Sequence, residues 1–194
     1  MQDTWYGDRR DIVKWGTLAH LVKREALKLI VQVPYLRIGA RSQLTTPTGT
    51  TEIDVSVWKH FRTVTSVQQL GPAIGCEILV IADEFDPRRR QDYSTTLEYQ
   101  LTKLSVRKAV LLDPDTGLSA KPKPEHVSIA EVQSAWKALR AGDYLVLYQH
   151  AWRNKRWKSE AQQRFSLACG ATNTEIFSAP RIASDVVFLA AQKN

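Results

Sequence analysis

The sequence has 194 residues, of which 43% are apolar, and a formal net charge of +7. This length fits a single domain over residues 1–194, and the apolar content excludes a disordered chain because it can offset the loss of chain entropy. No apolar run is long enough to span a bilayer and no signal segment opens the chain, so we expect a cytoplasmic protein. Cys76 and Cys169 lack the neighbouring Cys or His ligands of a zinc site and are expected to be buried, reduced thiols.

Helices and strands alternate in the first half of the chain. Asp8 is placed to cap a helix with apolar side chains at helical spacing, and Pro34 ends the β-branched run that follows it. Pro87 suits the first turn of a later helix. In chain order we predict a helix over 9–27, a strand over 29–33, a loop over 42–51, an ambiguous helix over 54–70, a break at Gly71-Pro72 and Gly75, a strand over 76–82 and a helix over 87–104.

The second half continues the alternation and ends in two strands. Ser128 and Glu131 form a capping box, in which each side chain bonds the other residue's exposed backbone amide, and Gly142 is expected to close the helix that begins there. In chain order we predict a strand over 109–112, a loop over 120–125, the capped helix from 129, a strand over 143–148, a basic helix over 154–169 and strands over 175–178 and 185–190. The short connection between the last two strands favours an antiparallel hairpin.

This order of elements predicts the fold class. Strands that alternate with helices form an α/β fold, with a Rossmann-like, mostly parallel sheet covered by helices on both faces. The last two strands add a C-terminal antiparallel pair. The sequence shows no internal repeat and no clear linker.

Acidic side chains follow the apolar strand over 109–112. That strand runs directly into Asp113-Pro114-Asp115, and in open α/β sheets ligands bind just beyond the carboxyl ends of the strands. Asp113 and Asp115 are therefore candidate catalytic residues. His150 follows another predicted strand, so we expect it at the same edge of the sheet as a general base or a phosphate contact.

Basic and aromatic residues are mixed where the 154–169 helix begins. Basic side chains neutralise phosphates and flat aromatic rings stack on bases, so the mixture favours a nucleic acid as partner. Further basic clusters lie at residues 9–10 and 88–90. The candidate nucleic-acid-binding residues are Arg153, Arg156, Trp157 and Lys158.

Three stretches resemble one family of enzymes. Gly7 to Trp15, with an Asp, two aliphatic residues and Lys14, is similar to the N-terminal helix of the 23S ribosomal RNA adenine N6-methyltransferases. Leu112-Asp113-Pro114 is similar to the Asp-Pro-Pro-aromatic motif that these enzymes place at the end of the fourth strand, and Tyr144 to Tyr148 lies where they place the fifth. The chain thus resembles a divergent class I S-adenosylmethionine-dependent methyltransferase, nearest to that family.

The resemblance implies S-adenosylmethionine as the cofactor and a role for several residues. Gly39 would belong to the cofactor-binding loop, and Glu84, just past a strand, would accept the ribose hydroxyl groups. Asp113 would lie at the cofactor and accept a hydrogen bond from an exocyclic amine, which it would orient towards the methyl group. Lys14 and Tyr6 would lie near this site.

Two other functions stay open. Asp115 and Thr116 stand where the family has a second proline and an aromatic residue. Acids follow both the strand predicted over 76–82 and the strand predicted over 109–112. If these two strands are neighbours, several carboxylates would converge and bind Mg²⁺, which would give a nuclease or phosphohydrolase. A non-catalytic nucleic-acid-binding module on the same fold is the third possibility. The acids concerned are Asp83, Glu84, Asp86, Asp113 and Asp115.

Overall fold

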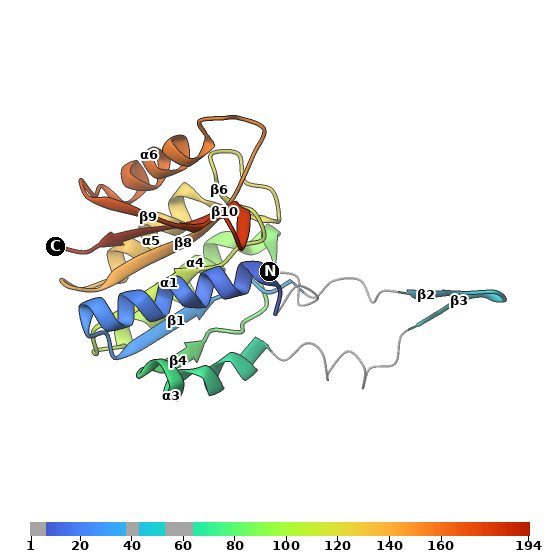
Figure 1. The fold of residues 1–194 in the computed structure, drawn as a ribbon, viewed down its shortest axis with the longest axis horizontal. Coiled ribbons are helices and arrows are strands. Elements are labelled where there is room, and N and C mark those ends of the chain that lie inside the picture. The colour runs from blue at the N-terminus through green and yellow to red at the C-terminus, as the bar shows by residue number, and fades with distance from the viewer. Residues whose placement is uncertain (1–6, 38–42, 53–63) are drawn as a thin grey trace.

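The computed structural model of the chain describes residues 7–37, 43–52 and 64–194 (Figure 1). The described helices are α1 (Arg9–Glu25), α3 (Gly71–Ile74), α4 (Arg90–Lys103), α5 (Ile129–Ala138) and α6 (Trp157–Cys169), together with the 3₁₀ helices η2 (Val64–Leu70) and η3 (Pro87–Arg89). The described strands are β1 (Leu29–Val33), β2 (Gln43–Thr46), β3 (Gly49–Glu52), β4 (Glu77–Val80), β5 (Lys108–Leu112), β6 (Gly117–Ser119), β7 (His126–Ser128), β8 (Tyr144–His150), β9 (Thr174–Ala179) and β10 (Ala183–Gln192).

The central sheet has six strands in the order β4-β1-β5-β8-β10-β9. The first four run parallel to their neighbours, whereas β10 is antiparallel to both β8 and β9. The predicted fold class is therefore confirmed: the chain has an α/β, Rossmann-like fold with a mostly parallel sheet and a C-terminal antiparallel pair.

Helices cover both faces of this sheet (Figure 1). Successive side chains of β1 point to opposite layers, so Val31 packs with apolar residues of α4, α5 and α6, while Ile30 packs with those of α1 and η2. The same alternation continues in β5, where Val110 belongs to the first layer and Leu111 to the second. Because all five residues of β1 and of β5 are buried, these two strands form the centre of the fold.

Local signals in the sequence fix several ends of these elements. The Asp8 carboxylate caps α1 and accepts from Arg10 N at 2.7 Å, and the predicted capping box of Ser128 and Glu131 is present at the start of α5. A buried ion pair ties the starts of β5 and β8, with Lys108 Nζ 2.6 Å from Asp143 Oδ2.

The predicted loop over 42–51 is wrong, because β2 and β3 form an antiparallel hairpin there. Threonine is β-branched and suits extended backbone, and Thr45 pairs with Thr50 across the turn. Gly49 ends that turn with a φ of +135°. Most of the ambiguous helix over 54–70 lies outside the described residues, and its last part, η2, is a 3₁₀ helix.

Three predicted boundaries also differ. Gly71-Pro72 does not break the chain but starts α3, because proline is accepted in the first turn of a helix, and the break falls at Gly75 with φ +80°. α5 ends at Ala138, so Gly142 does not close it. β8 continues to His150, which places Gln149 and His150 inside the strand.

In the part of the chain that the structure describes, no helix is both long enough and apolar enough to cross a membrane. Both cysteines are free thiols; Cys169 is buried as predicted, whereas Cys76, just before the edge strand β4, is only half-buried, so its predicted burial is wrong.

Candidate functional site

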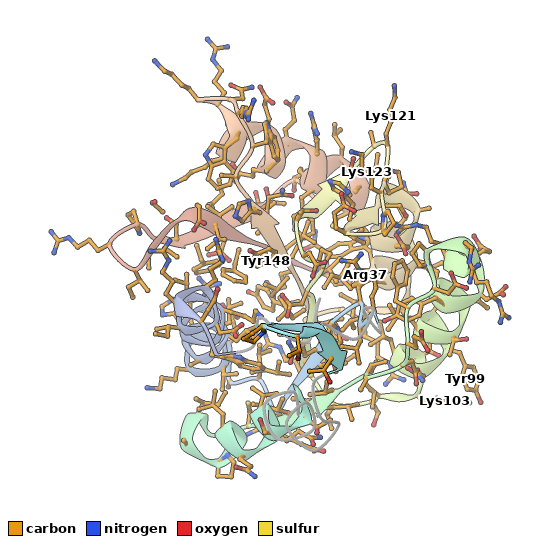
Figure 2. The ribbon with its side chains drawn as sticks, turned by 90° about the vertical axis from the view of Figure 1, so that its right-hand side faces the viewer. Arg37, Tyr99, Lys103, Lys121, Lys123 and Tyr148 are labelled. Carbon is orange, nitrogen blue, oxygen red and sulfur yellow. The ribbon has the colours of Figure 1, made fainter. Side chains whose placement is uncertain are left out.

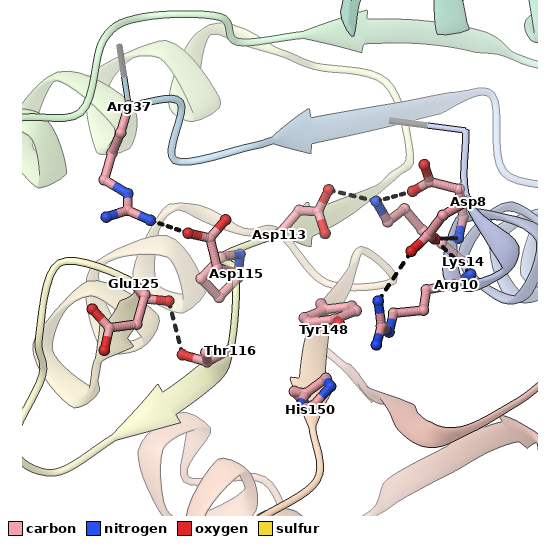
Figure 3. Close-up of a pocket in the computed structure, with 12 residues that line it drawn as sticks. Asp8, Arg10, Lys14, Arg37, Asp113, Asp115, Thr116, Glu125, Tyr148 and His150 are labelled. Atoms are coloured by element: carbon pink, nitrogen blue, oxygen red, sulfur yellow. Dashed lines mark hydrogen bonds and ion pairs between the residues drawn. The ribbon is translucent and has the colours of Figure 1, made fainter. Parts of the chain in front are cut away.

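A pocket of about 410 Å³ opens at the carboxyl ends of β1, β5 and β8 (Figure 3). In the sheet, β4 lies on one side of β1 and β5 on the other, so the order of strands reverses between β1 and β5. Ligands of open α/β sheets bind in the crevice at such a switch point. The described lining residues come from the N-cap and first turns of α1, the segment after β1, the segment after β5, the residue before β7 and the end of β8.

Two buried donors hold the Asp113 carboxylate in the pocket. Lys14 Nζ lies 2.8 Å from Asp113 Oδ2, and Gln32 Nε2 donates to the same oxygen at 2.8 Å. Lys14 Nζ also lies 2.5 Å from Asp11 Oδ1. The four side chains are buried and meet because this face of the sheet is covered by the start of α1.

The charges around Lys14 set its protonation state. Burial lowers the pKa of Lys14, but the carboxylates of Asp113 and Asp11 outweigh this and raise it above its ordinary value. Lys14 is therefore a fixed cation. Burial and the Asp113 carboxylate also raise the pKa of Tyr148. Among the described residues, the hydrogen bonds and ion pairs of the Asp113 side chain fall on Oδ2, which leaves Oδ1 to the pocket.

A second ion pair crosses the pocket between two strand ends. Arg37 follows β1 and Asp115 follows β5, and the guanidinium Nη2 of Arg37 is paired with Asp115 Oδ2. Both side chains are about a fifth exposed, at 21% and 23%. In Figure 3 this pair lies on the opposite side of Asp113 from Lys14.

A third group of charges lies at the end of β8. Arg10 Nη2 lies 2.6 Å from Asp185 Oδ2, and His150 Nε2 lies 3.3 Å from the same oxygen. The hydrogen bond from Arg10 is the main reason that the pKa of Asp185 is lowered. The His150 side chain is about a third exposed (34%) and lines the pocket near its rim.

Gln149 fixes the segment that carries Asp115 and Thr116. It is buried, its Oε1 accepts from Leu118 N at 2.9 Å, and its Nε2 donates to Thr116 O at 3.0 Å. Gly117 lies between these two contacts with φ +115°, and a Cβ there would come within 2.4 Å of the Gln149 amide. Only glycine fits this position.

Replacement of Gly117 by alanine is expected to lower the free energy of unfolding through two effects. The φ of +115° costs a non-glycine residue about 1–3 kcal/mol. The overlap with Gln149 adds a further cost of about 1–3 kcal/mol. Urea unfolding measures the sum. Gly75→Ala is the matched control, because Gly75 also has a positive φ (+80°) but has open space around it. Equal losses in the two variants would mean that Gln149 gives way.

The structure brings the three predicted catalytic residues to one pocket. Asp113, Asp115 and His150 all line it, and their catalytic roles stay predictions. Glu84 is exposed, pairs with Leu36 in an isolated β-bridge, and is not among the described lining residues. Gly39 and Tyr6 lie outside the described residues.

The predicted nucleic-acid-binding segment follows closely in the sequence on His150, which lines the pocket. Arg153 and Arg156 are exposed, and no carboxylate among the described residues pairs with them. Trp157 is half-buried, its ring lies 6.2 Å from that of Trp152, and Lys158 Nζ lies 5.6 Å from its centroid. The face of this tryptophan is thus already in contact with neighbours in the chain.

The other basic clusters are largely neutralised. Each arginine of the 88–90 cluster is paired: Arg88 with Asp86, Arg89 with Asp92, and Arg90 with Glu131. In the 9–10 cluster, Arg10 is held by carboxylates of Asp8 and Asp185. These residues therefore add less to a surface for polyanions than their number in the sequence suggests.

The Mg²⁺ alternative required the acids at 83–86 to converge with Asp113 and Asp115, and this expectation is wrong. β1 lies between β4 and β5, which separates the acids at 83–86 from Asp113 and Asp115. Asp113 is paired with Lys14, and Asp115 with Arg37. Within residues 7–37, 43–52 and 64–194, no group of three or more Asp, Glu, His or Cys side chains is suited to hold a metal ion.

Several pocket residues were not predicted from the residue pattern. Asp8 was expected only as a helix cap and Tyr148 only as a member of a strand, and no role was predicted for Arg37. A signal existed for the first turns of α1, because a helix that precedes the first strand of such a sheet can begin at its carboxyl edge. No local sequence pattern predicts that Arg37 lines the pocket.

Comparison with known proteins shows likeness of fold only. No protein-family model matches the sequence, and no curated protein matches it. The chain is similar to spermidine synthase from Thermotoga maritima, with 12% identity, a TM-score of 0.48 and coverage of 94% of this chain and 60% of that one. A DUF574 family protein from Streptomyces avermitilis (13% identity, TM-score 0.48, covering 96% and 82%) and PigF with SAH (12%, 0.40, covering 97% and 65%) are also similar. These values show a distant likeness of fold and no more, and membership of one family stays a prediction.

Proposed function

We propose that this chain transfers a methyl group from S-adenosylmethionine to an amine nitrogen of a nucleic acid base. The observation that carries the proposal is the state of Asp113 at the switch point of the sheet. Lys14 and Gln32 bind one carboxylate oxygen and leave the other to the pocket. A buried carboxylate with one free oxygen is suited to accept a hydrogen bond from an N–H donor.

The described pocket suits the cofactor in size and charge. Its volume of about 410 Å³ lies in the range of small-molecule sites. Among the described residues that line it, five carry a carboxylate and three a permanent positive charge. An excess of negative charge favours a sulfonium cation. We assign the ribose hydroxyl groups to Glu84 and the cofactor loop to the segment around Gly39.

Three residues of the pocket have distinct tasks in this proposal. When bound, S-adenosylmethionine supplies an electrophilic methyl group. Asp113 orients the amine through its free oxygen, and Lys14 holds that carboxylate in place through their ion pair. We assign to His150, at the rim, the acceptance of the proton that the nitrogen loses.

A basic rim supports a nucleic acid as the substrate. Figure 2 looks onto the face with Arg37 and Tyr148, and Lys121 and Lys123 lie on its outer part. These two lysines are exposed, as are Arg153 and Arg156. Cations around an acidic pocket match a polymer whose phosphates stay outside while one base enters.

Calorimetric titration of the full chain with S-adenosylmethionine tests the cofactor, and transfer of labelled methyl groups to single-stranded RNA tests the substrate. We expect saturable binding, and transfer that falls when Arg153, Arg156 and Lys158 are all changed to Glu. That triple variant should also weaken RNA binding about tenfold or more and flatten its salt dependence.

The outcomes separate the competing functions. Binding of RNA without any binding of S-adenosylmethionine would contradict the proposal and favour a non-catalytic nucleic-acid-binding module. Binding of Mg²⁺ that needs Asp113 and Asp115 would contradict the proposal. Methyl transfer that is equal in the wild type and the triple variant would contradict the nucleic acid substrate but not the cofactor.

A further inference from the structure

We infer that Arg37 and Asp115 bind the amino-acid end of the cofactor, a group that carries one α-carboxylate and one α-ammonium. This inference rests on the function proposed above and assigns residues of this chain to a part of the ligand.

The position of the pair is the first argument. Arg37 belongs to the segment after β1 and Asp115 to the segment after β5, so their ion pair bridges the two strand ends that flank the switch point. Both residues line the pocket. A ligand that enters the crevice between β1 and β5 therefore meets this pair.

The chemistry of the pair is the second argument. A guanidinium has five N–H donors and binds a carboxylate through two parallel hydrogen bonds. The Asp115 carboxylate beside it suits an ammonium group. A positive and a negative group side by side, each partly open to solvent, thus match the two charges of an amino acid.

The other cations of the pocket are less suited to this task. Arg10 is bound by two carboxylates, those of Asp8 and Asp185, and Lys14 is buried between Asp11 and Asp113. Among the described residues, Arg37 pairs with a single carboxylate, that of Asp115, whereas each of the other two cations that line the pocket pairs with two. Asp115 also stands where the resembled family has proline, so the pair is a feature of this chain.

Calorimetry with two ligands tests the inference without any turnover. S-adenosylhomocysteine carries the amino-acid end, whereas 5′-methylthioadenosine has the same nucleoside and sulfur without it. We expect the wild type to bind the first ligand more tightly. Arg37→Gln should lower the affinity for S-adenosylhomocysteine about 10- to 100-fold, because a charge-assisted contact is lost. It should change the affinity for methylthioadenosine by less than about twofold.

Asp115→Asn and the control Arg181→Gln complete the series. Asp115→Asn should act in the same selective direction as Arg37→Gln, and it keeps the test available if the first variant does not fold, which thermal unfolding checks. Arg181→Gln removes an exposed arginine outside the pocket lining and should leave both affinities unchanged.

Three results would overturn the inference. An equal loss of affinity for both ligands in Arg37→Gln would mean that Arg37 contacts the part that the two ligands share, or that it acts through the fold. Unchanged binding of S-adenosylhomocysteine would remove Arg37 from the site. A wild type that binds methylthioadenosine as tightly as S-adenosylhomocysteine would refute this assignment alone, whereas binding of neither ligand would refute the proposed function as well.

Discussion

Replacement of Asp113 by asparagine is expected to reduce methyl transfer about a hundredfold. Lys14 Nζ and Gln32 Nε2 both donate to Oδ2, so an amide at this position must place its oxygen there. Its NH₂ group then takes the place of Oδ1 and faces the pocket. A donor would meet the N–H of the substrate where the wild type offers an acceptor, and the amine would lose its orientation.

Initial rates with labelled S-adenosylmethionine measure this loss, and calorimetry with S-adenosylhomocysteine shows which ligand is affected. We expect cofactor affinity to change by less than about threefold, because the lost contact is to the amine. A parallel loss of affinity would assign Asp113 to the cofactor, as the resemblance also allows. The matched control is Asp83→Asn, an exposed acid beyond β4. Wild-type rates in Asp113→Asn would contradict the proposed role.

Signals within a few residues predicted the central elements well. Leu29 to Val33 is apolar apart from Gln32 and ends at a proline, and the predicted strand and β1 coincide. The capping box at Ser128 depends on a spacing of three residues, and it is present. Asp113 was placed at the pocket because the end of a buried strand is itself a local feature.

Contacts between distant residues could not be predicted in this way. The convergence of the acids at 83–86 with Asp113 required β4 and β5 to be neighbours, and the order of strands is a property of the whole chain. Arg37 and Asp115 are 78 residues apart, and Arg10 and Asp185 are 175 apart. The strand predicted to end at Tyr148 continues to His150 in β8, where the buried Gln149 side chain bonds the backbone of the segment after β5.

Replacement of Lys14 by methionine is expected to lower the free energy of unfolding by about 3–5 kcal/mol. Methionine fills a similar volume but leaves the carboxylates of Asp11 and Asp113 buried without their cation. Urea unfolding at pH 7 measures the loss. Lys23→Met is the matched control, because Lys23 lies on the same helix but is exposed and should change stability by less than about 0.5 kcal/mol.

The pH dependence of this loss tests whether Lys14 keeps its proton in the folded protein. The pKa of Lys14 is higher in the folded protein than in the unfolded chain, so its contribution to stability is complete below the unfolded value of about 10.4 and is lost as the pH rises through the folded value. The difference between wild type and Lys14→Met should therefore be the same at pH 7 and pH 9. A difference that shrinks over that interval would mean that Lys14 loses its proton inside the fold, and Asp113 would then lack the fixed cation that the proposed chemistry requires.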